Sequence, residues 1–211
     1  MDVPRTLPAR VYLAAYDVQR QKLTRTSRLN HLVRTAALEE LTLAGFLRDE
    51  DGKVVAPGRE RTGDPVLDGV LELVRESQGR HNWKHWVRRH GTRTRKALRD
   101  QLEAQRVIRV QPRRILGVVP SDRVTVRDTR AVKALQRTAA QAIGGGTPTP
   151  YLDPRDVALA AIAALGEVDT VCRGSVRRDN RRRIKELVAL SGPAVPALKK
   201  VLSDDASSTA G

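Results

Sequence analysis

Apolar residues recur along this chain mostly at the spacing of helices. Residues 28–43 place Leu, Val and Ala on one side of a helical wheel, which predicts an amphipathic helix. Residues 153–165 are almost entirely apolar, which predicts a helix buried at the centre of the fold. Other periodic segments are rich in Ala, Leu and Arg and lack the Val, Ile and Thr alternation of strands. The pattern therefore predicts a mainly α fold around an apolar central helix.

Capping residues mark further helices. Asp64 is a predicted N-cap, and Pro65 suits the first position of a helix that runs to about Glu76. Residues 7–16 form a short element at the start of the chain. Further helices are expected over residues 82–106 with an interruption near Gly91, and over residues 128–143, 176–190 and 193–202.

Two pairs of short apolar segments predict small surface β-hairpins. In the first, residues 46–48 and 53–55 flank residues 49–52, which contain an Asp-Gly pair typical of a hairpin. In the second, Val107–Val119, residues 111–114 are the expected turn and Pro120 is the expected end.

We interpret residues 1–211 as a single globular domain. The chain is 40% hydrophobic, which is enough for one substantial core. The Gly- and Pro-rich residues 144–150 are expected to form a surface loop, because the following segment would be a marginal domain by itself. The ordered core is expected over residues 7–202, and residues 203–211 are expected to fray.

Net charge is concentrated in two blocks. The chain carries a formal charge of +15, and residues 80–114 hold 12 Lys and Arg against 2 acids. Residues 173–185 hold 7 against 1, so these blocks account for the whole excess. Such concentration on an otherwise balanced chain favours a surface that meets a polyanion, on lipid or on nucleic acid.

Several classes of protein are disfavoured. The single cysteine, Cys172, excludes an intrachain disulfide and a Cys-based zinc cluster, and fits a reducing compartment. The chain begins without a signal-peptide pattern, and its longest apolar run, residues 157–165, is too short to span a bilayer. No phosphate-binding loop, nucleophile elbow or Cys–His pair appears. We therefore expect a non-enzymatic, cytoplasmic protein without cofactor or metal.

Three pairs of residues could have a functional role, but the sequence disfavours that role in each case. Trp83 and Trp86 are expected in the core rather than in a membrane. His81 and His85 have the spacing of a helical zinc site, but no third ligand is evident. A paired acid/base role for Asp64 and Asp68 is conceivable, but capping and helix-dipole stabilisation explain their spacing sufficiently.

Four segments of the chain form a recognisable set in their order and spacing. They are residues 40–47 (ELTLAGFL), 62–68 (TGDPVLD), 98–108 (LRDQLEAQRVI) and 181–187 (RRRIKEL). Together they resemble the Golgi phosphoprotein 3 family, in particular its bacterial members, which are frequent in high-GC genomes such as those of actinobacteria. The likeness extends over residues 7–202, and its most specific part is the Thr-Gly-Asp helix start.

The resemblance implies a peripheral membrane protein that binds an anionic phospholipid headgroup, phosphatidylinositol 4-phosphate in the eukaryotic members, through a basic pocket. The family's pocket arginines correspond to Arg34, Arg95 and Thr92, and Arg93 and Lys96 lie close enough along the helix to replace the missing one. The family's membrane-inserting tryptophan corresponds to Arg25, so the apolar wedge is absent. The predicted headgroup site is therefore Arg34, Arg95, Arg93, Lys96, Thr92 and Arg25.

The resemblance also implies self-association through the second hairpin. The residues expected at that homo-oligomer contact are Val110, Pro112, Arg113, Ile115 and Val118.

Two rival hypotheses remain open. A basic helix followed by a hairpin is the outline of a winged helix, so a nucleic-acid-binding module without sequence specificity is the alternative. A scaffold that has lost lipid binding is the other. The arginines of the second basic block, Arg178, Arg181 and Arg182, are either a second anionic contact or a solubilising face.

Overall fold

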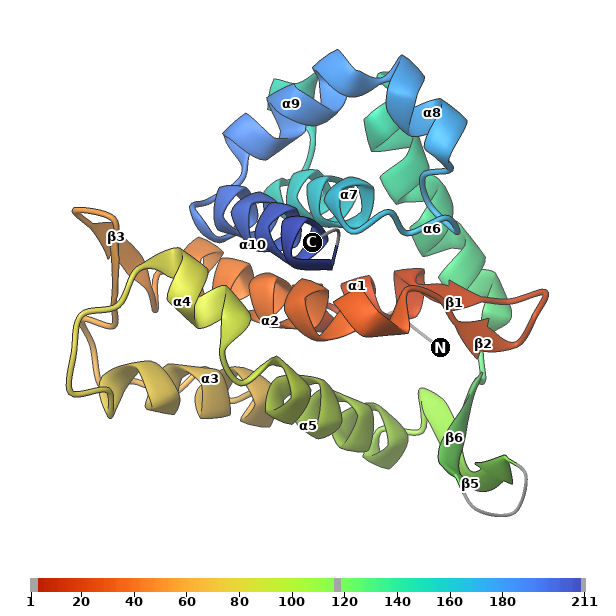
Figure 1. Ribbon diagram of the computed structural model, residues 1–211, viewed down its shortest axis with the longest axis horizontal. Coiled ribbons are helices and arrows are strands. Elements are labelled where there is room, and N and C mark those ends of the chain that lie inside the picture. Colours follow the sequence, from red (N-terminus) through yellow and green to blue (C-terminus); the bar gives the residue numbers. More distant parts are fainter. Residues whose placement is uncertain (1–3, 116–118, 210–211) are drawn as a thin grey trace.

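Helix α2 (Thr26–Leu43) runs through the middle of the molecule, and other helices surround it. The computed structural model describes residues 4–115 and 119–209 (Figure 1). The helices that contact α2 are α1 (Leu7–Ala14), α3 (Pro65–Arg75), α4 (Trp83–Arg88), α5 (Gly91–Ala104), α7 (Pro154–Leu165) and α10 (Ala194–Thr209).

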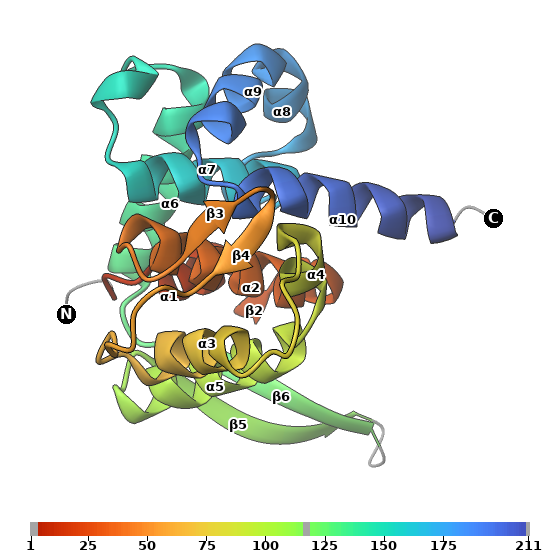
Figure 2. The same ribbon diagram turned by 90° about the vertical axis from the view of Figure 1, so that its left-hand side faces the viewer.

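The helices form stacked layers, which confirms the prediction of a mainly α fold. Helices α3 and α5 lie on one side of α1 and α2, and α7 and α10 lie on the opposite side (Figures 1 and 2). The outer face of α7 is covered by a further group, which comprises α6 (Thr129–Gly144), the short 3-10 helix η1 (Thr149–Tyr151), α8 (Gly174–Asp179) and α9 (Arg181–Leu190).

Helix α7 is buried as predicted, with an unbroken buried run from Val157 to Ala164. The amphipathic interpretation of residues 28–43 is wrong, because α2 also buries polar side chains and leaves Leu43 partly exposed. A pattern of apolar positions cannot show that a polar position has a partner elsewhere in the fold. The buried polar residues of α2 are Arg34, Thr35, Glu39 and Glu40.

Two of these buried groups hold distant segments against α2. The Glu40 carboxylate accepts a hydrogen bond from the Leu7 backbone N–H (2.8 Å) and pairs with Arg155 (2.7 Å). It therefore joins the first turns of α1 and α7. Glu39 accepts a hydrogen bond from the Gly192 N–H (2.6 Å), at the turn between α9 and α10.

Three short antiparallel ribbons lie outside the helical layers. The first, β1 (Tyr16–Asp17) with β2 (Lys22–Leu23), has no clear signal in the sequence. The second, β3 (Arg48–Glu50) with β4 (Lys53–Val55), confirms the Asp-Gly hairpin, although its first strand lies two residues later than predicted. The third, β5 (Ile108–Ile115) with β6 (Val119–Val126), projects from the body near α5 (Figure 2).

The second predicted hairpin is present, but its predicted turn is wrong. Residues 111–114 belong to strand β5, and Pro120 lies inside β6 instead of ending the hairpin. Val118 lies outside the described residues.

Both prolines are compatible with the ladder because of where they fall in it. The Arg127 N–H donates to the Val107 carbonyl (3.1 Å), which fixes the alternation of hydrogen-bonded and non-hydrogen-bonded pairs. Pro112 and Pro120 both fall at non-hydrogen-bonded pairs, where the missing N–H removes no bond between the strands.

Two helix boundaries also differ from expectation. The predicted helix over residues 176–190 is divided at Asn180 into α8 and α9. The predicted frayed tail is wrong through Thr209, since α10 continues to that residue. Asp204 and Asp205 of this extension form ion pairs with α4, which hold it against another element.

The buried Glu39 carboxyl should make stability depend on pH. Burial raises its pKa from the ordinary 4.5 to about 7, so the unfolded chain ionises first as the pH rises. The free energy of unfolding therefore falls as the pH rises from the ordinary pKa of 4.5 towards about 7. Relative to Glu39→Gln, the free energy of unfolding of the wild type should fall by roughly 3 kcal/mol from about pH 4 to about pH 8. Chemical denaturation across this range measures the difference, and parallel profiles would contradict it.

Gly91 should not tolerate a side chain. A Cβ there would lie 2.8 Å from the backbone oxygen of Asn30, and backbone cannot move aside as a side chain can. We expect Gly91→Ala to lower the free energy of unfolding by about 1–3 kcal/mol. The matched control is Gly69→Ala in α3, where a Cβ meets nothing within 4 Å. Because alanine favours helix, this control should raise the free energy of unfolding by up to about 1 kcal/mol. If both variants changed the free energy of unfolding in the same direction, the close-packing argument would be refuted.

Candidate anion-binding site

The corner between α4 and α5 brings positive side chains from three elements together. Asn82 caps α4 by accepting a hydrogen bond from the His85 N–H (2.9 Å). The chain then turns at His90, which has a left-handed φ of 62°, and α5 begins at Gly91. The missing Cβ of Gly91 lets the first turn of α5 approach the backbone of α2 at Asn30.

A cavity of about 570 Å³ lies at this end of α5, and we call it the corner cavity. Side chains of Arg88, Arg93 and Lys96 supply positive charge to its lining, and no Asp or Glu is among the described residues that line it. The N-cap of α5 makes no side-chain hydrogen bond, so the positive end of that helix adds to the same field. The lining residues are Asn30, His31, Arg88, His90, Gly91, Thr92, Arg93 and Lys96.

Arg34 lies buried beside this corner and lacks a carboxylate partner among the described residues. Its Nε donates to the Trp86 carbonyl (3.0 Å) and its Nη1 to the Thr94 hydroxyl (3.2 Å), while Nη2 has no hydrogen-bond partner there. The guanidinium also lies 5.7 Å from the centre of the Trp86 ring. Burial, and secondarily Arg93, lowers the pKa of Arg34 to about 10, so it remains charged at neutral pH.

All four histidines of the chain lie in or next to the same corner. His31 and His90 line the cavity, and the rings of His81 and His85 stack with their centroids 3.9 Å apart. Burial, followed by neighbouring positive charges, lowers the pKa values of His85 and His90. These two histidines are therefore neutral at pH 7, and Arg and Lys carry the charge there.

The structure brings only part of the predicted headgroup site together. Thr92, Arg93 and Lys96 line the corner cavity. Arg34 is fully buried, so its guanidinium is not accessible for direct contact with a ligand in this form. Arg95 lines a different cavity.

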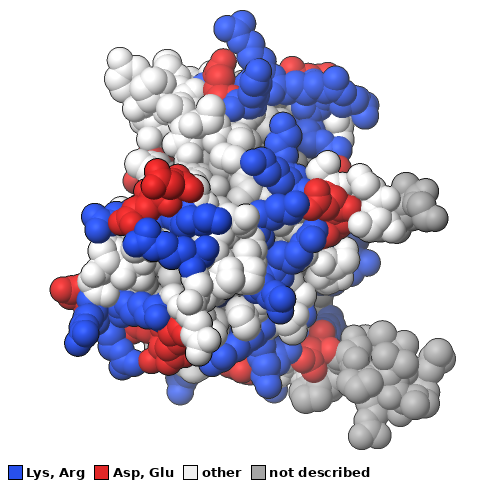
Figure 3. Space-filling view, turned by 60° about the vertical axis from the view of Figure 1, so that its left-hand side comes forward, with Lys and Arg blue, Asp and Glu red and all other residues white. Residues whose placement is uncertain are grey.

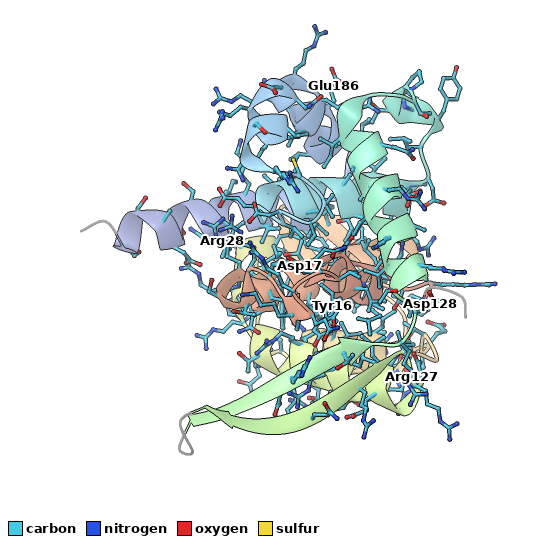
Figure 4. The ribbon with its side chains drawn as sticks, turned by 90° about the vertical axis from the view of Figure 1, so that its right-hand side faces the viewer. Tyr16, Asp17, Arg28, Arg127, Asp128 and Glu186 are labelled. Atoms are coloured by element: carbon cyan, nitrogen blue, oxygen red, sulfur yellow. The ribbon has the colours of Figure 1, made fainter. Side chains whose placement is uncertain are left out.

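Arg25 lies apart from both groups. Its Nε donates to the Glu167 carbonyl (2.7 Å), and its guanidinium pairs with Asp169 (3.0 Å). Arg28, labelled in Figure 4 near the start of α2, pairs with the Glu167 carboxylate (2.8 Å). Arg25 therefore fastens the start of α2 to the segment after α7.

The cavity that holds Arg95 measures about 580 Å³ and is also basic. It lies between the β1–β2 ribbon, α5 and β6, and Tyr12 lines it from the core. Burial raises the pKa of Tyr12 to about 12, so its hydroxyl stays protonated at neutral pH. Asp122 is the one acid among the described lining residues, and Arg99 pairs with it. The basic lining residues are Arg20, Lys22, Arg95, Arg99 and Arg123.

Lys and Arg side chains are spread over much of one face of the molecule, from the α9 end to the α3 and α5 end (Figure 3). In the second basic block, several arginines have structural roles: Arg177 pairs with Glu167 (3.0 Å), and Arg183 donates to the Ala142 carbonyl (3.0 Å). The side chains of Arg178, Arg181 and Arg182 are exposed. Both interpretations of this block stay open.

The remaining sequence-based interpretations have mixed outcomes. Trp83 and Trp86 are buried, as predicted. Asp64 caps α3 and Asp68 lies in the first turn of that helix, both as predicted, and Asp68 also accepts hydrogen bonds from Thr62. Of the predicted oligomer contact, Val110, Pro112, Arg113 and Ile115 lie on β5 and Val118 lies outside the described residues, so self-association stays a prediction.

Sequence reasoning missed His31, Asn30 and Arg88 as members of the cavity. The predicted interruption at Gly91 was a signal for the corner, but nothing in the sequence indicated which turn of α2 packs there. Within the described residues, no cluster of three His, Cys, Asp or Glu side chains could hold a metal ion. No helix of the described chain has the length and apolar content to cross a membrane.

Comparison with known proteins finds a family but no individual relative. None of the curated protein sequences matches this chain. The family model described as Golgi phosphoprotein 3 (GPP34), however, matches residues 7–204. That span includes every helix from α1 to α9 and the part of α10 up to Asp204, together with both basic cavities. The chain therefore belongs to the Golgi phosphoprotein 3 (GPP34) family.

Proposed function

We propose that this protein is a non-enzymatic, peripheral membrane protein that binds the phosphate of an anionic phospholipid headgroup in the corner cavity. The observation that carries the proposal is that Arg93 and Lys96 line a cavity with no carboxylate among its described lining residues, beside Arg34, whose Nη2 has no hydrogen-bond partner there. Arg88 also lines the cavity, and it pairs with Asp204 and Asp205 outside the lining. Guanidinium groups bind phosphate oxygens in pairs, and the free amide end of α5 adds donors of the same polarity.

Membership of the family supports a phosphoinositide, and phosphatidylinositol 4-phosphate is the first headgroup to test. The cavity supplies the two features such a headgroup requires, namely cations for the phosphate and polar groups, Asn30 and Thr92, for hydroxyls. Asn30 donates a hydrogen bond to the Thr92 hydroxyl (3.1 Å), which places both groups on one wall. Each basic residue near an anionic bilayer contributes on the order of 1 kcal/mol, so Arg95 in the neighbouring cavity adds to membrane affinity without touching the same phosphate.

The arrangement of α5 disfavours nucleic acid as the main partner. Leu98 and Leu102 are buried, because one side of α5 packs against α2 and α3. The remaining exposed side offers arginines and a lysine, which would hold a phosphate backbone without reading sequence. Duplex DNA as a competitor distinguishes the two partners.

Charge reversal in the cavity should abolish selective membrane binding. Arg93→Glu with Lys96→Glu should weaken binding at least about tenfold to phosphatidylcholine vesicles that contain phosphatidylinositol 4-phosphate, because two attractive charges become repulsive. Co-sedimentation at physiological salt, with duplex DNA present, measures the loss.

The matched control for this experiment reverses two exposed charges on α6, Lys133→Glu with Arg137→Glu, and changes the net charge equally. If the control loses as much binding, or if DNA removes all binding, net charge explains the association and the cavity does not.

The field of Arg34 can be tested separately from its hydrogen bonds. Arg34→Lys keeps a buried positive charge and should retain most vesicle binding. Arg34→Met keeps comparable bulk but removes the charge, and should weaken binding several-fold, since a buried charge is poorly screened by salt. Circular dichroism and thermal unfolding verify that both variants fold. Equal binding by two folded variants would show that Arg34 is only structural.

A further inference from the structure

The C-terminal end of α10 places two carboxylates on the basic corner. Asp204 pairs with Lys84 (2.6 Å) and with Arg88 (3.4 Å). Asp205 pairs with Arg88 (2.9 Å) and contacts the His31 Nε2 (3.3 Å). In Figure 3, red side chains adjoin blue side chains at the base of the projection on the right of the view.

These contacts use groups that also belong to the corner cavity. Arg88 and His31 line the cavity, and both face the carboxylate of Asp205. The hydrogen bond from Lys84, together with nearby positive charges, holds the pKa of Asp204 below its ordinary range, so this carboxylate stays ionised at neutral pH. An external phosphate that approached Arg88 would therefore meet a cation already paired with an internal acid.

The contact is built so that a stronger anion can displace it. Val201 is the last fully buried residue of α10, and the residues that follow it are partly or fully exposed. The helix end projects from the body on the same side as the β5–β6 ribbon (Figure 2). The side chains of Asp204 and Asp205 are about half exposed, and ion pairs between exposed side chains contribute little to stability.

We propose that Asp204 and Asp205 form an autoinhibitory acidic latch, which competes with the phosphate of the lipid for the cations of the corner. The latch rests on the proposed function of the cavity. When the cavity is empty, the two acids neutralise Lys84 and Arg88 and hold the end of α10 in place. An anionic bilayer repels these carboxylates and attracts the same cations, so binding releases the end of α10.

Asp204→Asn with Asp205→Asn tests the latch without altering the cavity itself. The double variant should bind vesicles of phosphatidylcholine and phosphatidylinositol 4-phosphate about tenfold more tightly than the wild type, since two competing ion pairs are lost. The matched control, Asp179→Asn with Glu186→Gln, removes two acids from α8 and α9; Glu186 is labelled in Figure 4, at the opposite end of the molecule from the ribbon. The control should bind like the wild type.

A second measurement follows the end of α10 directly. Amide hydrogen exchange over residues 203–208 should be faster in the double variant without vesicles, and faster in the wild type when vesicles are bound. Exchange over residues 194–201, which pack in the core, should not change in either case.

The outcomes separate the latch from the function on which it rests. Tighter binding by the double variant alone, with faster exchange at residues 203–208, supports the latch. If the wild type binds vesicles and the control variant gains as much affinity as the double variant, the latch is overturned and the lipid site remains supported. Absence of vesicle binding by the wild type and by both variants overturns the proposed function, and the latch with it.

Discussion

The structure depends on how α2 buries its charged side chains. A helix surrounded by other helices has no route to water for its polar groups, and an unpartnered buried charge costs several kcal/mol. Glu40 is neutralised by Arg155 and by the first amide of α1, and Glu39 is held by the amide of Gly192. These bonds join α2 to segments near both ends of the chain. The charges of the central helix therefore specify how the outer helices are placed, in addition to the apolar contacts that supply most of the stability.

Arg34 differs from Glu40 because it has no carboxylate partner among the described residues, and it differs from Glu39 because it remains charged at neutral pH. Its hydrogen bonds go to the neutral acceptors Trp86 and Thr94, so its positive charge is not cancelled inside the described part of the protein. The corner of α4 and α5 adds more positive charge a short distance away. A protein optimised only for stability would place a carboxylate or an apolar side chain there. Under the proposed function, a bound anion would supply the negative charge that this corner lacks.

The sequence predicted the helical elements well and their mutual arrangement poorly. The apolar run of α7, the Asp64 cap and the break at Gly91 are local signals, and each corresponds to an observed feature. The burial of α2 was missed because its polar residues find partners far away in sequence. The sequence also could not show that Arg34 is fully buried while Arg95 lines the cavity beside the β1–β2 ribbon, so the two were assigned to one site. The turn of the second hairpin was misplaced because a proline usually ends a strand, and only the ladder register shows that both prolines are tolerated.

Under the proposed function, the position of Arg25 bears on how this protein would meet a membrane. The resemblance aligns the family's inserting tryptophan with Arg25, and the side chain of Arg25 is engaged with Glu167 and Asp169. Without an apolar wedge at that position, attachment would rely on charge, and charge attraction is screened by salt and selective only through geometry. The corner cavity provides that geometry, because its cations are held by helices rather than by a loop. Under the proposed function, discrimination between phospholipids would depend on how many phosphate oxygens can reach Arg93 and Lys96 at once, and a monoester phosphate that extends from its ring would satisfy this better than the diester phosphates of the bilayer surface.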